Sequence, residues 1–389
     1  MPVIAEIASR QPILAEWRRM LHTIPELGFE EEKTAAFVVD RLQAMGIEAH
    51  TGMARTGVVG IIEGRPGNRR IGLRADMDAL PMEELGKPAW KSKNPGRFHG
   101  CGHDGHTVML LAAAEYLART RAFAGTVVLI FQPAEEGLGG GRVMVEEGLF
   151  DRFPCDEIYA LHNMPLLPVG QAAVRPGAAL AAFDRFDVTI TGRGGHAAMP
   201  HKTIDPAIVM SQTVLALQAL ISRETDPMES AVLSVTEMHV GTTHNVIASE
   251  GRIAGTVRAL NEAARARIEA GFHRTVTHVV EAYGASVRIE YAREFPVLVN
   301  DGGAVERAMS AIADVLGSDG LAKTFPPLMA AEDFAFMLQK RPGAYILVGQ
   351  GTGPDSPMVH HPEYDFNDAI IATGASLFVR IAEGALKAD

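Results

Sequence analysis

The sequence predicts an α/β fold in which a large domain, built on a mostly parallel sheet covered by helices, carries a smaller inserted α+β domain. The length of 389 residues exceeds that of one average domain. Short apolar strands without alternation are separated by helices over the first 180 or so residues. Near residue 183 the pattern changes to strands that alternate cleanly between apolar and polar positions.

The first part of the chain alternates helices with buried strands. The run QPILAEWRRMLH at 11–22 has the pattern of an amphipathic helix, and a second helical run ends at Gly46, a residue suited to a left-handed C-cap. We expect a further helix at 107–120 and apolar strands within 57–64, 70–78, 125–137 and 157–165. Strands of this kind are typical of a sheet with both faces covered.

Residues 183–294 predict the inserted domain. Strands at 183–192, 230–240, 251–260 and 286–296 are combined with helices at 206–223 and 261–284. The resulting order, strand–helix–strand–strand–helix–strand, is that of a ferredoxin-like sandwich. From about residue 296 the chain returns to helix and buried strand, including 343–349, so 1–182 and 295–389 are predicted to form the larger domain.

Composition excludes several classes of protein. The formal charge is 36 − 47 = −11, and no basic run is long enough to follow a phosphate backbone, which argues against nucleic acid as a partner. No apolar run approaches the roughly 18–20 residues that cross a bilayer, and Glu6 and Arg10 interrupt what a signal peptide would need to keep apolar. The 2 cysteines cannot form a disulfide framework, so we expect a cytoplasmic protein with reduced thiols.

The stretch FHGCGHDGHT at 98–107 concentrates metal-ligand residue types. Cys101 and His103 are one residue apart in a glycine-rich loop, and thiolate with imidazole suits zinc or another late divalent metal. A glycine-rich turn before a helix has the same composition, so this pair alone leaves both interpretations open. Asp104 is interpreted as a cap of the helix that follows, and His22 and His106 as ordinary helix histidines.

Polar residues also follow the other predicted strands. The carboxyl ends of strands in an open α/β sheet form its ligand crevice, so side chains from separate segments should converge there. We expect one of the two adjacent carboxylates, Glu135 and Glu136, just past the end of the strand within 125–137 to bind metal while the other faces substrate, because consecutive residues at a strand end point to different sides. The converging residues are Asp76 and Asp78, Cys101 and His103, Glu135 and Glu136, His162, and either His360 or His361. Together they predict a metal site.

Seven motifs in chain order carry a family resemblance. They are RRMLHTIPELGFEEEKT (18–34), RADMDALP (74–81), GCGHDGHT (100–107), FQPAEEG (131–137), LHNMP (161–165), GRGGHAAMPH (192–201) and HHPEYDFND (360–368). The chain resembles the aminoacylase/hippurate hydrolase branch of the co-catalytic metallopeptidases, which includes bacterial N-acyl-amino-acid amidohydrolases and plant auxin-conjugate hydrolases. The resemblance implies a two-metal α/β catalytic domain with an inserted ferredoxin-like dimerisation or lid domain.

The resemblance also implies roles for individual residues. The metal ligands would be Cys101, which would bridge two divalent ions, with His103, Glu136, His162 and His360. The ions would be zinc or manganese, with cobalt or nickel also compatible. The remaining roles would be Glu135 as general base, His196 reaching across a dimer to the oxyanion, Asn245 and Arg258 contacting substrate, and Asp78 orienting a histidine ligand. Asp76 stands where the wider clan has a ligand histidine, which leaves its role open, and the H-x-P pattern favours His360 over His361.

The expected function is hydrolysis of the amide bond of N-acyl amino acids by a homodimer or homotetramer. A dipeptidase, an N-acetyl-diaminopimelate-type deacetylase and a non-catalytic metal-binding module are the alternatives, and Glu135 argues against the last because a structural zinc site needs no free carboxylate beside it. The run TGRGGHA at 191–197 matches a dinucleotide-binding fingerprint, but Pro200 prevents the helix that this motif must open. Glu332 and Asp333 either begin a helix or line the site.

Overall fold

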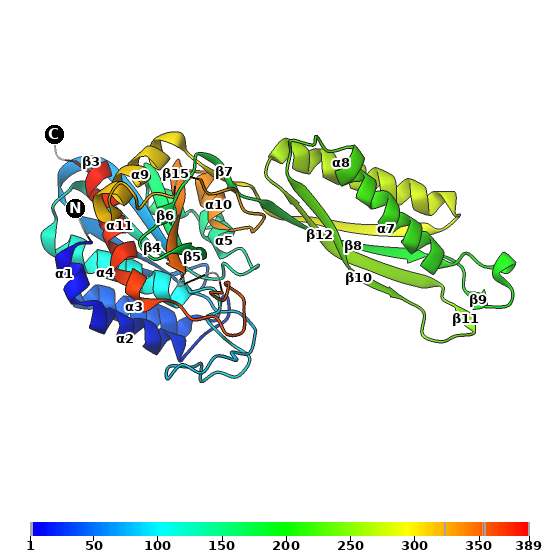
Figure 1. Ribbon diagram of the computed structural model, residues 1–389, viewed down its shortest axis with the longest axis horizontal. Coiled ribbons are helices and arrows are strands. Elements are labelled where there is room, and N and C mark those ends of the chain that lie inside the picture. Colours follow the sequence, from blue (N-terminus) through cyan, green and yellow to red (C-terminus); the bar gives the residue numbers. More distant parts are fainter. Residues whose placement is uncertain (1–2, 323, 352, 354, 388–389) are drawn as a thin grey trace. The chain divides into compact units, whose positions relative to one another are not determined.

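The computed structural model describes residues 3–322, 324–351, 353 and 355–387, and the chain divides into two compact units (Figure 1). The first unit runs from the N-terminal segment to Ala179 and includes Val299–Pro326 and the chain from Asp333 onward. The second comprises Leu180–Leu298 and the short stretch Pro327–Glu332. The predicted insert at 183–294 lies inside the second unit, but Pro327–Glu332 was predicted to belong to the larger domain. Hydrogen bonds account for this difference. The Ala181 N–H donates to the carbonyls of Leu328 and Ala330, which ties this short stretch to the start of the second unit.

The first unit is built on a seven-stranded sheet in the order β1-β2-β4-β3-β5-β15-β6. Its central strands β4, β3, β5 and β15 are parallel, whereas β1, β2 and β6 add antiparallel pairings at the two edges. The strands are β1 (Glu48–Met53), β2 (Gly57–Glu63), β3 (Arg65–Asp76), β4 (Ala124–Gln132), β5 (Glu157–Pro168), β6 (Ala172–Ala173) and β15 (Gly343–Gly351). The predicted α/β class is therefore confirmed, with a parallel centre and antiparallel edges.

Helices cover both faces of this sheet. Every residue of β15 is buried, as a strand without alternation requires when neither face meets water. The core joins Leu73 and Leu129 of the sheet to Leu111 of α4 and Phe378 of α11. The helices are α1 (Ala5–Ser9), α2 (Gln11–His22), α3 (Glu32–Ala44), α4 (His103–Thr120), α5 (Gly140–Glu146), α6 (Leu149–Arg152), α9 (Gly302–Leu316), α10 (Phe334–Leu338), α11 (Ile371–Ala385) and the 3₁₀ turn η2 (Asp368–Ile370).

Helix α4 begins four residues before its predicted start at 107. Gly102, with a φ of 92°, turns the chain into the helix in a left-handed conformation that side-chain-bearing residues rarely adopt. His103 consequently lies in the first turn of α4 rather than in a loop, and His106 lies in the helix, as predicted. His162 likewise lies within β5, beside Leu347 of β15, rather than after the strand. These local features place His103 and His162 at the same edge of the sheet.

The second unit has the connectivity β8-α7-β10-β12-α8-β13. Its four-stranded sheet has the order β10-β12-β8-β13 with antiparallel pairings, and α7 and α8 cover one face (Figure 1). Val188, Ile253, Leu217 and Phe272 are among the residues of its separate core. The elements are β8 (Ala182–Thr191), α7 (Pro206–Arg223), β10 (Ala231–Val240), β12 (Glu250–Ala259), α8 (Glu262–Ala282) and β13 (Ser286–Phe295). This is the ferredoxin-like order that the sequence predicted.

Four short strands and one 3₁₀ turn complete the elements. A two-stranded sheet pairs β9 with β11, and another pairs β7 with β14. Their bounds are β7 (Gly177–Leu180), β9 (Gly195–His196), η1 (Pro200–Lys202), β11 (Val246–Ile247) and β14 (Leu298–Asn300). In the part of the chain that the structure describes, no helix is both long enough and apolar enough to cross a membrane.

Candidate metal centre

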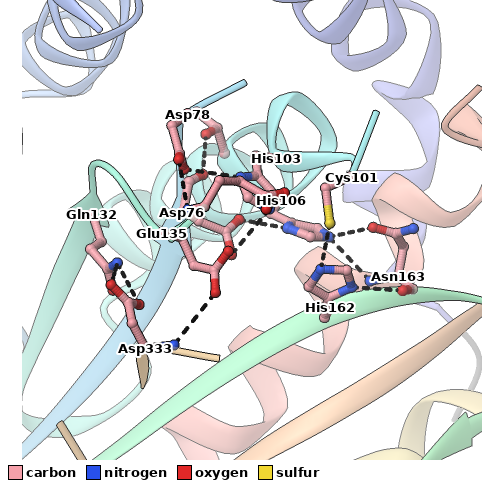
Figure 2. A network of polar contacts seen from close by, with 12 residues as sticks. Asp76, Asp78, Cys101, His103, His106, Gln132, Glu135, His162, Asn163 and Asp333 are labelled. Atoms are coloured by element: carbon pink, nitrogen blue, oxygen red, sulfur yellow. Dashed lines mark hydrogen bonds and ion pairs between the residues drawn. The ribbon is translucent and has the colours of Figure 1, made fainter. Parts of the chain in front are cut away.

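The Cys101 side chain is common to two groups of candidate metal ligands. One group joins it to His103 and His162, and the other joins it to Glu136 and His360, with ligand atoms within 4.8 Å of one another in each group. Cys101 Sγ lies 3.4 Å from His162 Nε2 (Figure 2), and Glu136 Oε1 lies 3.1 Å from His360 Nε2. The structure thus brings the five predicted ligands together, with the thiol between the two groups.

His360 and His361 differ in backbone conformation and in hydrogen bonding. His360 has a φ of 67°, and its N–H donates to the Gly100 carbonyl at 2.7 Å, which ties it to the loop that carries Cys101. His361 instead accepts a hydrogen bond from Glu363 N through Nδ1 at 3.1 Å. Of these two histidines, only His360 belongs to a candidate ligand group among the described residues.

Hydrogen bonds fix the orientation of two of the imidazoles, His162 and His103. His162 Nδ1 must donate to the Asn163 carbonyl at 2.7 Å, since a carbonyl only accepts, and this leaves the Nε2 lone pair facing Cys101. His103 Nδ1 lies 3.1 Å from Asp78 Oδ1, and the second oxygen of Asp78 accepts the Glu136 N–H at 2.9 Å. Such carboxylate–histidine pairs fix the ring and its tautomer in metal sites.

The electrostatics of the cluster fit a bound cation. Among the described residues, His103 Nε2 and Glu136 Oε1 are buried without a hydrogen bond. Burial raises the pKa of the Cys101 thiol well above its usual range, and Glu136 and Glu135 raise it further. Burial acts to lower the pKa of His103, but Asp76 and Asp78 outweigh it and raise that pKa to about 10. Divalent ions would neutralise this concentration of negative charge, and the mixed thiolate, imidazole and carboxylate donors suit zinc and its neighbours.

Glu135 and Glu136 lie in a turn after β4. The sequence placed them at the strand end, where strand geometry would separate their side chains, but β4 ends at Gln132. Ala134 has a φ of 54°, and this left-handed residue changes the chain direction immediately before the two carboxylates. Glu135 is only 7% exposed, and its Oε1 lies 3.4 Å from the backbone N–H of Asp333 (Figure 2). Glu135 thus has a defined position beside the candidate ligands.

A buried polar network centred on Arg74 lies behind these residues. The fully buried guanidinium of Arg74 contacts Asp76 at 2.7 Å, Gln132 at 2.9 Å and Asp333 at 3.2 Å. Asp333 also accepts hydrogen bonds from Gln132 and from Gly141 N. An arginine in the buried second half of β3 was the available sequence signal, but its partner Asp333 lies 259 positions away.

Asp76 belongs to the same network. Its Oδ1 lies 2.6 Å from His106 Nδ1, and His106 Nε2 lies 2.7 Å from Asn163 Oδ1. Burial opposes ionisation of Asp76, but His103, Arg74 and His106 hold its pKa well below the usual range. Asp76 Oδ2 is 3.9 Å from His103 Nε2, while its hydrogen bonds go to Arg74 and His106. His106 is therefore fully buried and hydrogen-bonded through both ring nitrogens. It belongs to this network and is not an ordinary helix histidine.

A second buried polar cluster connects the first turn of α4 to the end of α2. His22 Nδ1 lies 2.7 Å from Asp104 Oδ2, and His22 Nε2 lies 3.6 Å from Glu84 Oε1. Burial acts to lower the pKa of His22, but Asp104 outweighs it and raises that pKa to about 9. The interpretation of Asp104 as a helix cap was wrong, because Gly102 is the N-cap of α4 and Asp104 lies inside the helix, where Oδ2 binds His22 and Oδ1 accepts from the adjacent Gly105 N.

The remaining predicted residues lie in the second unit, at opposite ends of its sheet. His196 and Asn245 are neighbours, because Ala197 N donates to the Asn245 carbonyl at 3.1 Å, and both side chains are exposed. Arg258 lies near the other end of β12, eight residues beyond Glu250, which corresponds to roughly 26 Å along a strand. Its half-buried guanidinium lies 4.2 Å from the centre of the Phe183 ring and makes no ion pair or hydrogen bond among the described residues.

Comparisons with known proteins agree with this geometry. Residues 72–384 match peptidase family M20/M25/M40. The chain is 37% identical over 387 residues to hippurate hydrolase of Campylobacter jejuni, covering 100% of both chains. It is 38% identical over 372 residues to IAA-amino acid hydrolase ILR1-like 4 of Arabidopsis thaliana, covering 94% of this chain and 84% of that one.

Solved structures show the same relationship. The chain resembles the Bacillus subtilis YXEP protein, described as a dinuclear metal binding peptidase from the M20 family, with a TM-score of 0.85 and 31% identity over 98% of this chain and 99% of that one. The predicted class, a metal-dependent hydrolase of amide bonds, is confirmed by these matches. The chain belongs to peptidase family M20/M25/M40.

Proposed function

We propose that this protein hydrolyses the amide bond of N-acyl amino acids, releasing a carboxylic acid and a free amino acid, with two divalent metal ions. The observation that carries the proposal is the position of Cys101 Sγ in two ligand groups, with Glu135 buried beside them. The relatives support the substrate class, because the substrates named in hippurate hydrolase and IAA-amino acid hydrolase are acylated amino acids. The YXEP protein, described as dinuclear, supports the number of ions.

The proposed centre divides its residues between metal binding and proton transfer. Cys101 would bridge the ions, with His103, Glu136, His162 and His360 as the other ligands. When bound, the ions lower the pKa of a water molecule and polarise the amide carbonyl. Glu135 accepts the proton of the attacking water and passes it to the leaving nitrogen, a contribution of about 10²–10⁴-fold for a positioned acid–base group. Asp78 keeps His103 in its metal-binding tautomer.

Arg258 is the proposed partner of the substrate carboxylate. Its guanidinium has no anionic partner among the described residues and can grip a carboxylate with two parallel hydrogen bonds. His196 is proposed to stabilise the oxyanion, with Asn245 beside it contacting substrate. Because His196 and Arg258 lie at opposite ends of one sheet, we propose that they serve different centres in an assembly of at least two chains. The first unit is then the catalytic domain and the second the dimerisation or lid domain.

The donor types suggest which metals the centre would bind, and the cysteines suggest the cellular compartment. A thiolate beside imidazoles favours zinc, and manganese, cobalt or nickel also fit mixed carboxylate and imidazole donors. Two cysteines without a disulfide fit the reducing cytoplasm.

The test is amine release from a panel of N-acyl amino acids that includes N-benzoyl-glycine and N-acetyl-methionine. The chelated protein is reloaded separately with zinc and manganese, and Glu135→Gln is measured beside it. Metal-dependent release that is lost in the variant supports the proposal. Release only from dipeptides with a free α-amino group, or only from N-acetyl-diaminopimelate, would replace the substrate class. No release from a folded, metal-loaded protein would contradict the function.

A further inference from the structure

The turn that carries Glu135 and Glu136 is held by a residue far away in the chain. Glu31 lies just before α3, 103 positions from Ala134, and it is fully buried. One carboxylate oxygen accepts the Ala134 N–H at 2.8 Å, and the other accepts the Thr56 hydroxyl at 2.5 Å. Burial raises the pKa of Glu31 to about 7, so a buried carboxyl group is maintained here against a cost. That cost calls for a structural or functional reason.

The anchored residue has an unusual conformation. Ala134 adopts a φ of 54° although it is not glycine, and it immediately precedes Glu135. Its own carbonyl accepts a hydrogen bond from Gly140 N at 2.9 Å. A left-handed alanine persists only where the surroundings over-determine it. Glu31 supplies one of these constraints directly at the backbone N–H.

A second observation shows that the segment before α3 is built to reach this turn. A Cβ added to Gly28 would lie 3.0 Å from Ala134 Cα and 2.8 Å from the Leu138 side chain, so the two backbones approach closely. On the other side of Glu135, Asp78 accepts the Glu136 N–H at 2.9 Å. Two carboxylates from separate segments therefore hold the backbone on either side of Glu135.

We propose that Glu31 is a positioning residue for the reaction: by holding the Ala134 N–H, it fixes the left-handed turn that directs Glu135 towards substrate and Glu136 towards metal. This inference rests on the proposed roles of Glu135 and Glu136. Glu31 acts on the proposed catalytic group through the turn, because one carboxylate oxygen bonds to Ala134 while the other bonds to Thr56 outside the turn. Its removal should therefore reduce turnover more than substrate binding.

The experiment compares three variants of the full-length, metal-loaded protein. Glu31→Ala removes the acceptor, and we expect kcat to fall by about 10- to 100-fold with KM within about threefold, the size of effect that a small misplacement of a catalytic group produces. Glu31→Gln keeps an oxygen for Ala134 N–H and an N–H for the Thr56 hydroxyl, so its kcat should stay within about threefold of wild type. Thr56→Val removes only the other bond, so we expect it to lower stability and to retain kcat.

Hydrogen exchange supplies a readout that does not depend on activity. Exchange measured by mass spectrometry on peptides covering 131–140 should rise in Glu31→Ala and stay near wild type in Glu31→Gln. If Glu31→Ala fails to fold, Ala134→Val replaces it, because a β-branched residue resists positive φ while Glu31 stays in place, and the same loss of kcat is expected.

Three outcomes overturn the proposal: wild-type kcat in Glu31→Ala or in Ala134→Val, unchanged exchange over 131–140, or kcat losses that follow thermal stability equally in all the variants. Failure of the proposed function is distinguishable from these. Full activity in Glu135→Gln would refute the role of Glu135, while the exchange measurement would still report whether Glu31 holds the turn.

Discussion

Replacing Asp78 with asparagine should remove one of the two hydrogen bonds that this carboxylate makes to the candidate metal ligands. Asp78 Oδ1 faces His103 Nδ1 at 3.1 Å, and Asp78 Oδ2 accepts the Glu136 N–H at 2.9 Å. Asparagine has only one oxygen, so its amide group must face one of these donors with a donor of its own. The residue is 2% exposed, and water therefore cannot replace the lost bond.

The expected magnitude follows from that loss. Loss of a carboxylate that orients a ligand histidine typically lowers metal affinity by about 10- to 100-fold, which corresponds to about 1.4–2.7 kcal/mol. Zinc affinity is measured on the stripped protein by competition with a chromophoric chelator, and kcat/KM is measured on the reloaded protein. Asp156→Asn is the matched control, because this exposed carboxylate also accepts a backbone N–H, that of Arg70 at 2.7 Å. A folded Asp78→Asn protein that binds zinc within twofold of wild type would refute the reasoning.

Two further predictions concern pH and substrate charge. Because the pKa of His22 is raised from 6.5 to about 9, its contribution to stability is fully present below pH 6.5 and is lost as pH rises through 9. The free energy of unfolding of wild type relative to His22→Gln should fall by on the order of 3 kcal/mol over that window. Urea denaturation of both proteins at pH 6 and pH 9.5 measures this change. An equal difference in unfolding free energy between the two proteins at both pH values would contradict the prediction. Arg258→Gln should reduce the preference for N-acyl amino acids over their carboxamides by about 10- to 150-fold, the value of a hydrogen bond to a charged group. Competition kinetics with paired substrates measures that preference, and an unchanged ratio would remove Arg258 from the substrate site.

Elements with local signals were predictable from the sequence. Helix α7 begins at Pro206 after Asp205, whose side chain accepts the Ala207 N–H, so the signal for its start lies in adjacent residues. Helix α2 also has its predicted bounds, because its apolar stripe ends with the helix at His22. The order of strands and helices in the second unit left few alternatives to a ferredoxin-like sandwich.

Features that depend on distant partners were not predictable. Ala134 is not a residue type that marks a left-handed turn, and its N–H is bonded to Glu31, 103 positions earlier. The buried charge of Arg74 is balanced partly by Asp333, which sequence patterns could not separate from a helix start. Single-sequence patterns report local conformation and burial, whereas these groups are explained only by tertiary hydrogen bonds.

We propose that Cys101 would serve as a ligand to both metal ions of one centre. Titration of the stripped protein with Co²⁺, followed by the thiolate-to-cobalt absorption band, tests it directly. We expect a band that saturates at two equivalents per chain in wild type and is absent from a folded Cys101→Ser protein. Saturation at one equivalent, or a band that persists in Cys101→Ser, would contradict it.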